Sequence, residues 1–85
     1  MNNPKTEVRY RNEVMRPIHE KNILQFLWDE GPQTSFDVAL HIELSLSHVR
    51  LHLCGLKAEG KLDAFRRDGM GYWMIAEDFD LEAAA

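Results

Sequence analysis

Apolar side chains recur at three- and four-residue intervals in three stretches of the chain, with polar side chains between them. These apolar positions are Ile23, Leu24, Leu27 and Trp28, then Val38, Ala39 and Ile42, and finally Leu46, Val49, Leu53 and Leu56. Because this spacing places the apolar side chains on one side of an α-helix, the pattern predicts three helices, each with one buried face.

The first predicted helix begins at Pro17 and ends before Gly31 and Pro32. Proline is tolerated in the first turn of a helix, glycine suits the position just after the last turn, and a following proline prevents continuation. The residues before Pro17 are polar and show no periodicity, so we expect residues 1–16 to form a flexible, basic N-terminal arm.

Only a residue or two separates the second predicted helix from the third. Thr34 precedes the second helix and Asp37 follows three residues later, which is close to a capping box, while Ser45 provides a cap for the third helix. Gly60 ends the third helix, which we place at residues 46–59.

Two short runs rich in aromatic and aliphatic residues follow, "KLDAF" and "GYWMI", separated by "RRDGM". Asp68-Gly69 is the strongest hairpin dipeptide in the chain, so the pattern predicts a two-stranded hairpin over residues 62–75. Tyr72 and Trp73 are consecutive in the second strand, so one should face the helices and the other the outside. We expect both to serve in packing, with stacking on a nucleic-acid base as the alternative.

This order of elements predicts an α+β fold, a winged helix-turn-helix with a three-helix core followed by a two-stranded antiparallel β-hairpin wing. We expect the domain to span residues 17–76, with an acidic C-terminal tail at 77–85. The resemblance to that superfamily rests on Thr34, Val38, Ala39, Ile42, Ser45, Val49, Arg50, Leu53, Leu56 and Gly60.

The segment "LKAEGKL" followed by "RRDGMGYWMI" resembles the small bacterial pilus-operon regulators of the PapI and FaeA type. Those proteins are also one short winged domain with an arginine pair, a glycine and a Tyr-Trp in the last strand. The resemblance implies a transcriptional regulator that binds DNA, in that family alongside a larger global regulator at methylation-sensitive sites. This chain has a shorter wing than that pattern, Asp68 beside the arginines, a basic arm and an acidic tail.

Composition indicates one globular domain in a cytoplasmic setting. The chain has 85 residues, of which 45% are hydrophobic and 28% charged, and this lies outside the ranges of disordered and membrane proteins. The single cysteine, Cys54, cannot form an internal disulfide, and the N-terminus has no apolar signal region. No apolar run approaches the roughly 20 residues of a membrane span, so we expect no membrane partner.

The net charge of -4 is unevenly distributed along the chain. Residues 46–67 carry five basic and two acidic side chains, whereas residues 68–85 carry five acidic ones and no basic one. Salt screens charges beyond roughly 8 Å, so a basic segment can attract a polyanion within an acidic protein. The same segment contains the third helix and the first strand of the wing.

The candidate DNA-binding residues lie on the exposed side of the third helix, at the wing tip and in the arm. They are Ser47, His48, Arg50 and Leu51, then Arg66 and Arg67, and as a further minor-groove or phosphate contact Arg9 and Arg11. For Arg66 and Arg67 the alternative is a solvated turn in which Asp68 pairs with one of them, and for Arg50 it is a surface salt bridge.

Other chemistry finds little support in the sequence. His48 and His52 are spaced i, i+4, but the remaining potential metal ligands show no spacing signature, so we expect no metal site. Cys54 has no resolving cysteine near it and should be inert. We find no catalytic constellation and no phosphate loop, so we expect no enzyme and no cofactor.

Two hypotheses remain. The first is a sequence-specific regulator of transcription that binds double-stranded DNA, with the third helix in the major groove and the wing on the backbone. Because its DNA-binding surface would be small, useful specificity would require a homodimer, a larger regulatory protein or tandem sites. The second is a winged-helix protein-interaction module or small regulatory inhibitor that does not bind DNA directly, which is favoured by the overall acidity and by the apolar Leu51 and Cys54. A continuous positive strip would favour DNA, and a mixed or apolar strip a protein partner.

Overall fold

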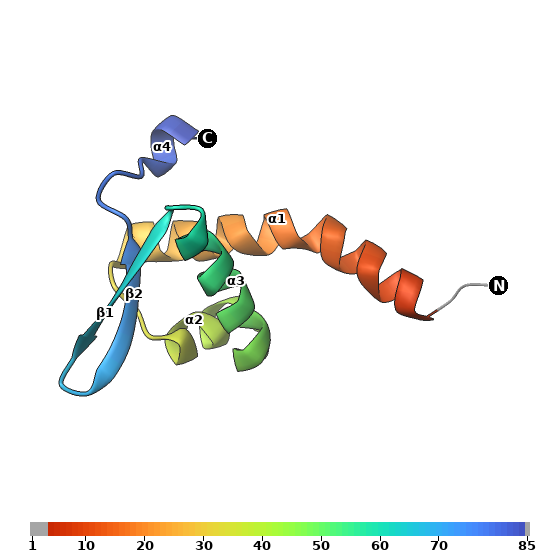
Figure 1. Ribbon diagram of the computed structural model, residues 1–85, viewed down its shortest axis with the longest axis horizontal. Coiled ribbons are helices and arrows are strands. Elements are labelled where there is room, and N and C mark those ends of the chain that lie inside the picture. Colours follow the sequence, from red (N-terminus) through yellow and green to blue (C-terminus); the bar gives the residue numbers. More distant parts are fainter. Residues whose placement is uncertain (1–3, 85) are drawn as a thin grey trace.

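The computed structural model describes the backbone of residues 4–84 and the side chains of residues 14–84. The elements follow in the order α1 (Pro4–Glu30), α2 (Ser35–Ile42), α3 (Leu46–Ala58), β1 (Leu62–Arg67), β2 (Met70–Ile75) and α4 (Leu81–Ala84). Three helices are thus followed by an antiparallel hairpin, and a single turn of helix ends the chain (Figure 1). This confirms the α+β winged helix-turn-helix predicted from the sequence.

The beginning of α1 differs from the prediction. The helix begins at Pro4 instead of Pro17, and Pro17 lies inside it. Proline is favoured in the first turn of a helix, and Pro4 occupies that position here. Pro17 cannot donate a backbone hydrogen bond to the carbonyl group four residues earlier, which is a common cause of helix bending. In Figure 1 the red N-terminal part of α1 is inclined to the rest of the helix and projects beyond the other elements.

The core lies where the three helices and the first strand meet. Its fully buried side chains are Ile23, Leu27, Val38, Val49, Leu53, Leu56 and Leu62. Each is worth roughly 1.5 to 3 kcal/mol when removed from water, so this small set supplies much of the driving force for folding. The buried faces of the helices are those that the apolar spacing predicts, except that Trp28 is 37% exposed.

The hairpin turns through two residues, Asp68 and Gly69, which both have positive φ angles of 51° and 80°. Two positive φ angles are typical of a type I′ turn, whose twist matches that of the strands. The register pairs Arg67 with Met70 at the tip and Leu62 with Ile75 at the base. Both arginines of "RRDGM" therefore belong to β1, so the connection is shorter than that segment.

Trp73 faces the helices, as the alternation along β2 predicts for one of the two aromatic residues. Its backbone exchanges hydrogen bonds of 2.7 and 3.0 Å with Gln33, and its indole Nε1–H donates to Ser35 Oγ at 2.9 Å. Tyr72 lies on the opposite face of the hairpin and stacks on Phe65, with the ring centroids 5.4 Å apart. These contacts fix the wing to the connection between α1 and α2.

The C-terminal segment folds back onto α1. Phe79 and Leu81 pack against the core, and Asp80 Oδ1 accepts hydrogen bonds from the backbone N–H groups of Glu82 and Ala83. In the part of the chain that the structure describes, no helix is both long enough and apolar enough to cross a bilayer.

Candidate nucleic-acid interface

Helix α3 begins directly after a tight connection from α2. Glu43 adopts the left-handed conformation at φ 58°, and Ser45 Oγ then accepts a hydrogen bond of 3.2 Å from the backbone N–H of His48. This cap satisfies one of the N–H groups that the first turn of a helix leaves without a partner. The short connection and the cap together fix where α3 starts and which side of it faces solvent.

The exposed side of α3 carries mostly small or uncharged residues along its middle. Ser47, Leu51 and Cys54 are exposed there, and Leu51 is 74% exposed. Stepping 100° per residue, Arg50 and Lys57 lie on one flank of this strip and His48 on the other. His48 is half-buried, whereas Arg50 and Lys57 are exposed.

The wing places its two arginines beside the turn. Arg66 and Arg67 are both exposed, and because they are consecutive in β1 their side chains leave opposite faces of the hairpin. Among the described side chains, no carboxylate oxygen lies within 4.0 Å of either guanidinium group, Asp68 included. Arg50 likewise has no carboxylate partner within that distance among residues 14–84.

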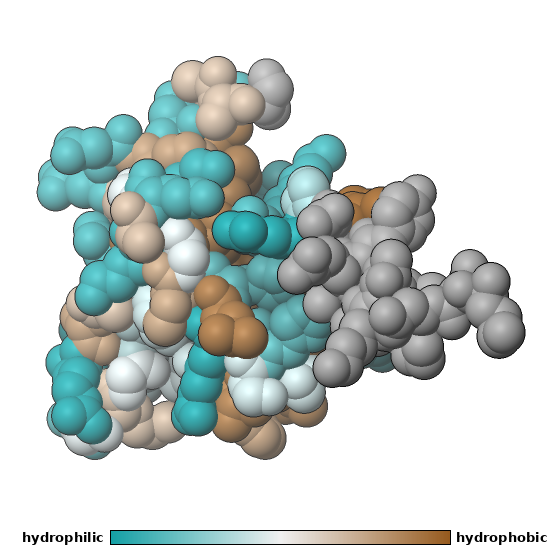
Figure 2. All heavy atoms as spheres, turned by 45° about the vertical axis from the view of Figure 1, so that its right-hand side comes forward, coloured by the Kyte–Doolittle hydropathy of each residue, from teal (hydrophilic) through white to brown (hydrophobic). Residues whose placement is uncertain are grey.

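Figure 2 shows a face of the molecule on which hydrophilic side chains surround several separate hydrophobic patches. That surface is mixed, and neither continuously apolar nor continuously polar.

The side chains of Arg9 and Arg11 lie outside the described residues, and the backbone of both belongs to α1. A DNA contact by these two residues stays a prediction.

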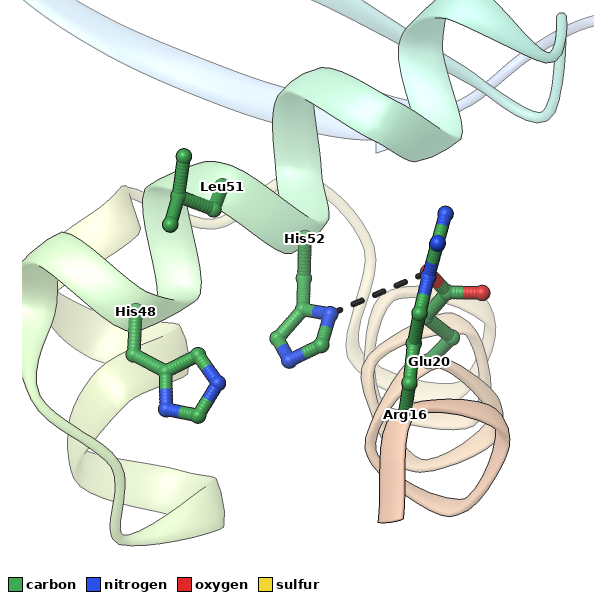
Figure 3. A pocket seen from close by; sticks show the side chains of 5 residues that line it. All are labelled: Arg16, Glu20, His48, Leu51 and His52. Atoms are coloured by element: carbon green, nitrogen blue, oxygen red, sulfur yellow. Dashed lines mark hydrogen bonds and ion pairs between the residues drawn. The ribbon is translucent and has the colours of Figure 1, made fainter. Parts of the chain in front are cut away.

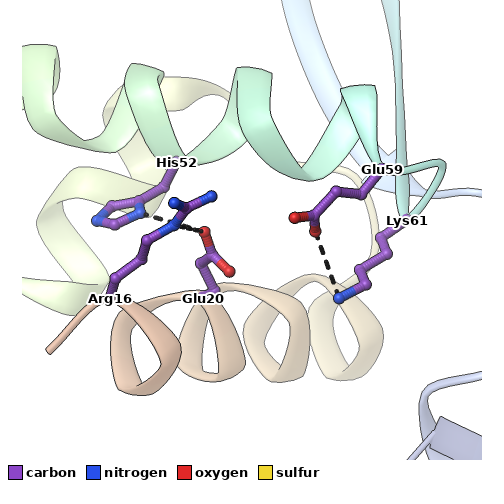
Figure 4. A network of polar contacts seen from close by, with 5 residues as sticks. All are labelled: Arg16, Glu20, His52, Glu59 and Lys61. Carbon is purple, nitrogen blue, oxygen red and sulfur yellow. Dashed lines mark hydrogen bonds and ion pairs between the residues drawn. The ribbon is translucent and has the colours of Figure 1, made fainter. Parts of the chain in front are cut away.

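A cluster of titratable side chains lies between α1 and α3, and sequence reasoning missed it as a group. Arg16, His19 and Glu20 come from α1, and His48 and His52 come from α3. Figure 3 shows these side chains except His19, and Figure 4 shows the contacts of Glu20 with Arg16 and His52. Arg16 Nε donates to Glu20 Oε1 at 2.8 Å, and His52 Nδ1 lies 3.7 Å from the same oxygen. The ring centroid of His48 lies 4.9 Å from that of His52, and those of His19 and His52 are 5.7 Å apart. We name this group the histidine cluster.

His52 is the most buried member of the histidine cluster, with 8% of its surface exposed. Its Nε2 atom is buried and has no hydrogen-bond partner among the described residues. Burial lowers the pKa of His52, and so do the nearby His48 and His19, whereas the carboxylate of Glu20 raises it by a smaller amount. The neutral imidazole is therefore favoured in the folded protein.

An open cavity of about 300 Å³ adjoins this cluster and is lined by Arg16, Glu20, His48, Leu51 and His52 (Figure 3). Within residues 14–84, no set of three or more histidine, cysteine or acidic side chains is arranged to hold a metal ion. The only sequence signal for this cluster was the i, i+4 spacing of His48 and His52, because the contribution of α1 arises from packing between distant segments.

Comparisons with known proteins bear directly on this geometry. The FaeA-like protein family matches residues 19–77, which covers the three-helix core and the wing. The chain belongs to the FaeA-like family. No curated protein sequence matches this FaeA-like protein.

Solved structures share its fold. The apo Zalpha domain of zebrafish PKZ is 25% identical, with a TM-score of 0.69 over 73% of this chain and 97% of that chain. The Zalpha domain of Carassius auratus PKZ, solved in complex with Z-DNA, is 23% identical, with a TM-score of 0.65 over 71% of this chain and 95% of that chain. A MarR family protein from Bacillus stearothermophilus is 15% identical, with a TM-score of 0.65 over 86% of this chain and 61% of that one.

These similarities confirm the family resemblance and the winged helix-turn-helix predicted from the sequence. The family and the fold of this FaeA-like protein are those of DNA-binding regulatory domains and not of enzymes.

Proposed function

We propose that this FaeA-like protein is a transcriptional regulator that binds double-stranded DNA sequence-specifically, with α3 in the major groove and the wing on the phosphate backbone. The observation that carries the proposal is the state of Arg50, Arg66 and Arg67. All three are exposed, and none has a carboxylate within 4.0 Å among the described side chains. Guanidinium groups that no described carboxylate neutralises, on a fold of DNA-binding regulators, are well suited to phosphate and to guanine.

The residues of α3 can serve distinct roles in this arrangement. Ser47 and Arg50 can form hydrogen bonds with base edges, and the exposed Leu51 can contact a thymine methyl group. His48, at the edge of the exposed side, is placed for a backbone or base contact. Arg9 and Arg11 would add a minor-groove or phosphate contact from α1.

A single domain of this size offers a small interface, so useful specificity requires a homodimer, a larger regulatory protein or tandem sites. A bacterial, cytoplasmic setting belongs to the same proposal. The Z-DNA complex of the Carassius auratus domain shows that a protein with this fold can contact DNA, and that ligand is a property of that protein.

The test is the salt dependence of binding to random-sequence duplex DNA. We expect Arg66→Ala/Arg67→Ala to bind more weakly and to reduce the log-log salt slope by about one unit per lost phosphate contact. Lys21→Ala/Lys61→Ala is the matched control, because it also removes two positive charges, and both lysines lie in a groove beside α4. The control should keep the slope of the parent. Selection of bound sequences from a random pool would then establish specificity.

A second function, that of a protein-interaction module, is favoured because the exposed side of α3 is a mixed strip and not a continuous positive one, with the apolar Leu51 and Cys54 exposed along its middle. A protein partner would bury them there. If no binding to duplex DNA is detectable at low salt and the arginine variant behaves like the parent, the protein-interaction module replaces the DNA proposal.

A further inference from the structure

The two flanks of α3 differ in the kind of charge that they offer. A helix in the major groove, which is about 12 Å wide, lies between two phosphate backbones. One flank carries two basic residues, Arg50 and Lys57, which lie seven residues apart on the same side of the helix. On the other flank the corresponding position is held by His48, and Arg16 of α1 lies beside it across the cavity.

The cavity on the second flank is lined by four polar side chains, one of which, His52, has a buried nitrogen atom without a hydrogen-bond partner among the described residues. Arg16 and Glu20 form one wall of the cavity and His48 and His52 the other, and Leu51, exposed on α3, is at its edge (Figure 3). His52 Nδ1 faces the carboxylate of Glu20, which favours the tautomer with its proton on Nδ1. Nε2 is then a lone-pair acceptor that has no partner within the described part of the chain, and only protonation converts it into a donor.

The charge of the site depends on the histidines. Arg16 is paired with Glu20 at 2.8 Å, so these two groups neutralise each other. The groups that face the cluster are Arg16, His19 and Glu20 from α1, and His48, His52 and the more distant Glu59 from α3 and its C-cap. Glu59 is paired with Lys61 at 3.4 Å. With the imidazoles neutral, the site therefore has no net charge, and one added proton makes it positive.

We infer that this cavity binds a backbone phosphate of the DNA and takes up a proton when it does so. The added proton resides on the imidazole of His48 or on that of His52, and Arg16 donates to the phosphate from the opposite wall. The inference rests on the proposed function, and it adds to the phosphate contacts of the wing a further one whose strength depends on pH. A phosphate group is the matching ligand because its oxygens accept hydrogen bonds from both guanidinium and imidazolium groups.

The test is the affinity for one duplex at constant ionic strength, from about pH 8 to about pH 6. Histidine protonation falls in this interval. We expect binding to strengthen about tenfold as the pH falls, which corresponds to a shift of roughly one pKa unit on binding. The His48→Gln variant should lose most of this gain in affinity. The Arg16→Gln variant should bind more weakly than the parent, and the loss should be largest at low pH.

The Glu20→Gln variant should change the affinity for DNA in the opposite direction. Removing this carboxylate leaves Arg16 unneutralised, so we expect stronger binding at about pH 8 and a flatter pH dependence than in the parent. His41→Gln is the matched control, because His41 stacks on Phe26 away from the cavity, with centroids 3.9 Å apart. It should keep the full pH dependence. His52 itself is left intact because it is buried.

Three outcomes would overturn the inference. If the parent and His48→Gln bind DNA with the same pH dependence and the salt slope stays normal, the cavity takes no phosphate and the proposed function stands. If no DNA binds at any pH, the proposed function fails and the inference fails with it. Finally, if millimolar inorganic phosphate alone shifts the NMR titration of His48 as much as the duplex does, the cavity is a site for free phosphate.

Discussion

Among the described side chains, two polar ones, Thr34 and His52, are buried with the apolar residues of the core, and they differ in how their hydrogen bonds are satisfied. Thr34 Oγ1 accepts a hydrogen bond of 3.1 Å from the backbone N–H of Asp37. His52 faces Glu20 on one side only, and its Nε2 atom has no described partner. A buried polar atom without a partner costs free energy, which is consistent with the role proposed for His52 in the cavity between α1 and α3.

The lowered pKa of His52 has a consequence for stability. The unfolded chain binds a proton at the ordinary histidine pKa of about 6.5, whereas the folded protein resists it to lower pH. We therefore expect the free energy of unfolding to be highest above about pH 6.5 and to decrease as the pH falls from there toward the folded-state pKa. Urea unfolding at a series of pH values measures this decrease.

His52→Gln should flatten that decrease, because glutamine does not titrate in this range. His41→Gln serves as the control, since no part of the cluster is removed. A parent whose stability is constant between about pH 7.5 and pH 5.5 would contradict the expectation, as would a variant with the same slope as the parent.

At the scale of single elements, the start of α3 depends on one hydroxyl group. Ser45 Oγ accepts the hydrogen bond from His48 N–H, and the same residue ends the connection from α2. We expect Ser45→Ala to lower the free energy of unfolding by about 1 kcal/mol, the usual cost of losing a cap. Ser47→Ala is the matched control, because Ser47 Oγ contacts only Ser45 Oγ at a long 3.4 Å. Denaturant unfolding should show a change below about 0.5 kcal/mol for the control.

Local chemistry explains which elements the sequence predicts well. Thr34, Ser45 and the Asp68-Gly69 turn each act through their own backbone neighbourhood, and the structure has a cap or turn at each of these places. Pro17 misled the prediction because a proline within a helix lowers its stability without excluding it, and Pro4 offers an earlier start.

The histidine cluster could not be predicted in the same way. His19 and Glu20 come within reach of His52 only when α1 packs against α3, so the relevant separation is more than thirty residues in sequence. The spacing of His48 and His52 identifies one wall of the cavity and gives no information about the other. The exposed positions Ser47, Arg50 and Leu51, in contrast, follow from the 100° step along a single helix.

At the scale of the whole molecule, positive and negative charges are separated. Arg50, Lys57, Arg66 and Arg67 lie on α3 and the wing, while the acidic C-terminal segment folds onto α1 (Figure 1). Because the net charge is -4, the protein as a whole repels a polyanion, whereas the proposed interface on α3 and the wing would attract one. The long-range repulsion acts on the rate of association and fades with added salt.

Neutralising the C-terminal segment should therefore strengthen DNA binding without adding any contact. The test variant is Glu77→Gln/Asp78→Asn/Glu82→Gln. Asp80 is retained because its carboxylate caps α4. We expect the affinity of this variant for DNA to be about three- to tenfold higher than that of the parent at low salt. The gain should disappear at about 1 M salt, where the screening length falls to roughly 3 Å. An increase in affinity that persists at high salt would mean that these carboxylates contact the interface directly. An unchanged affinity at low salt would mean that the charges near α4 do not contribute to the electrostatic potential at the bound DNA. Association rates measured by stopped flow separate the cases, because long-range repulsion changes the on-rate and direct contacts change the off-rate.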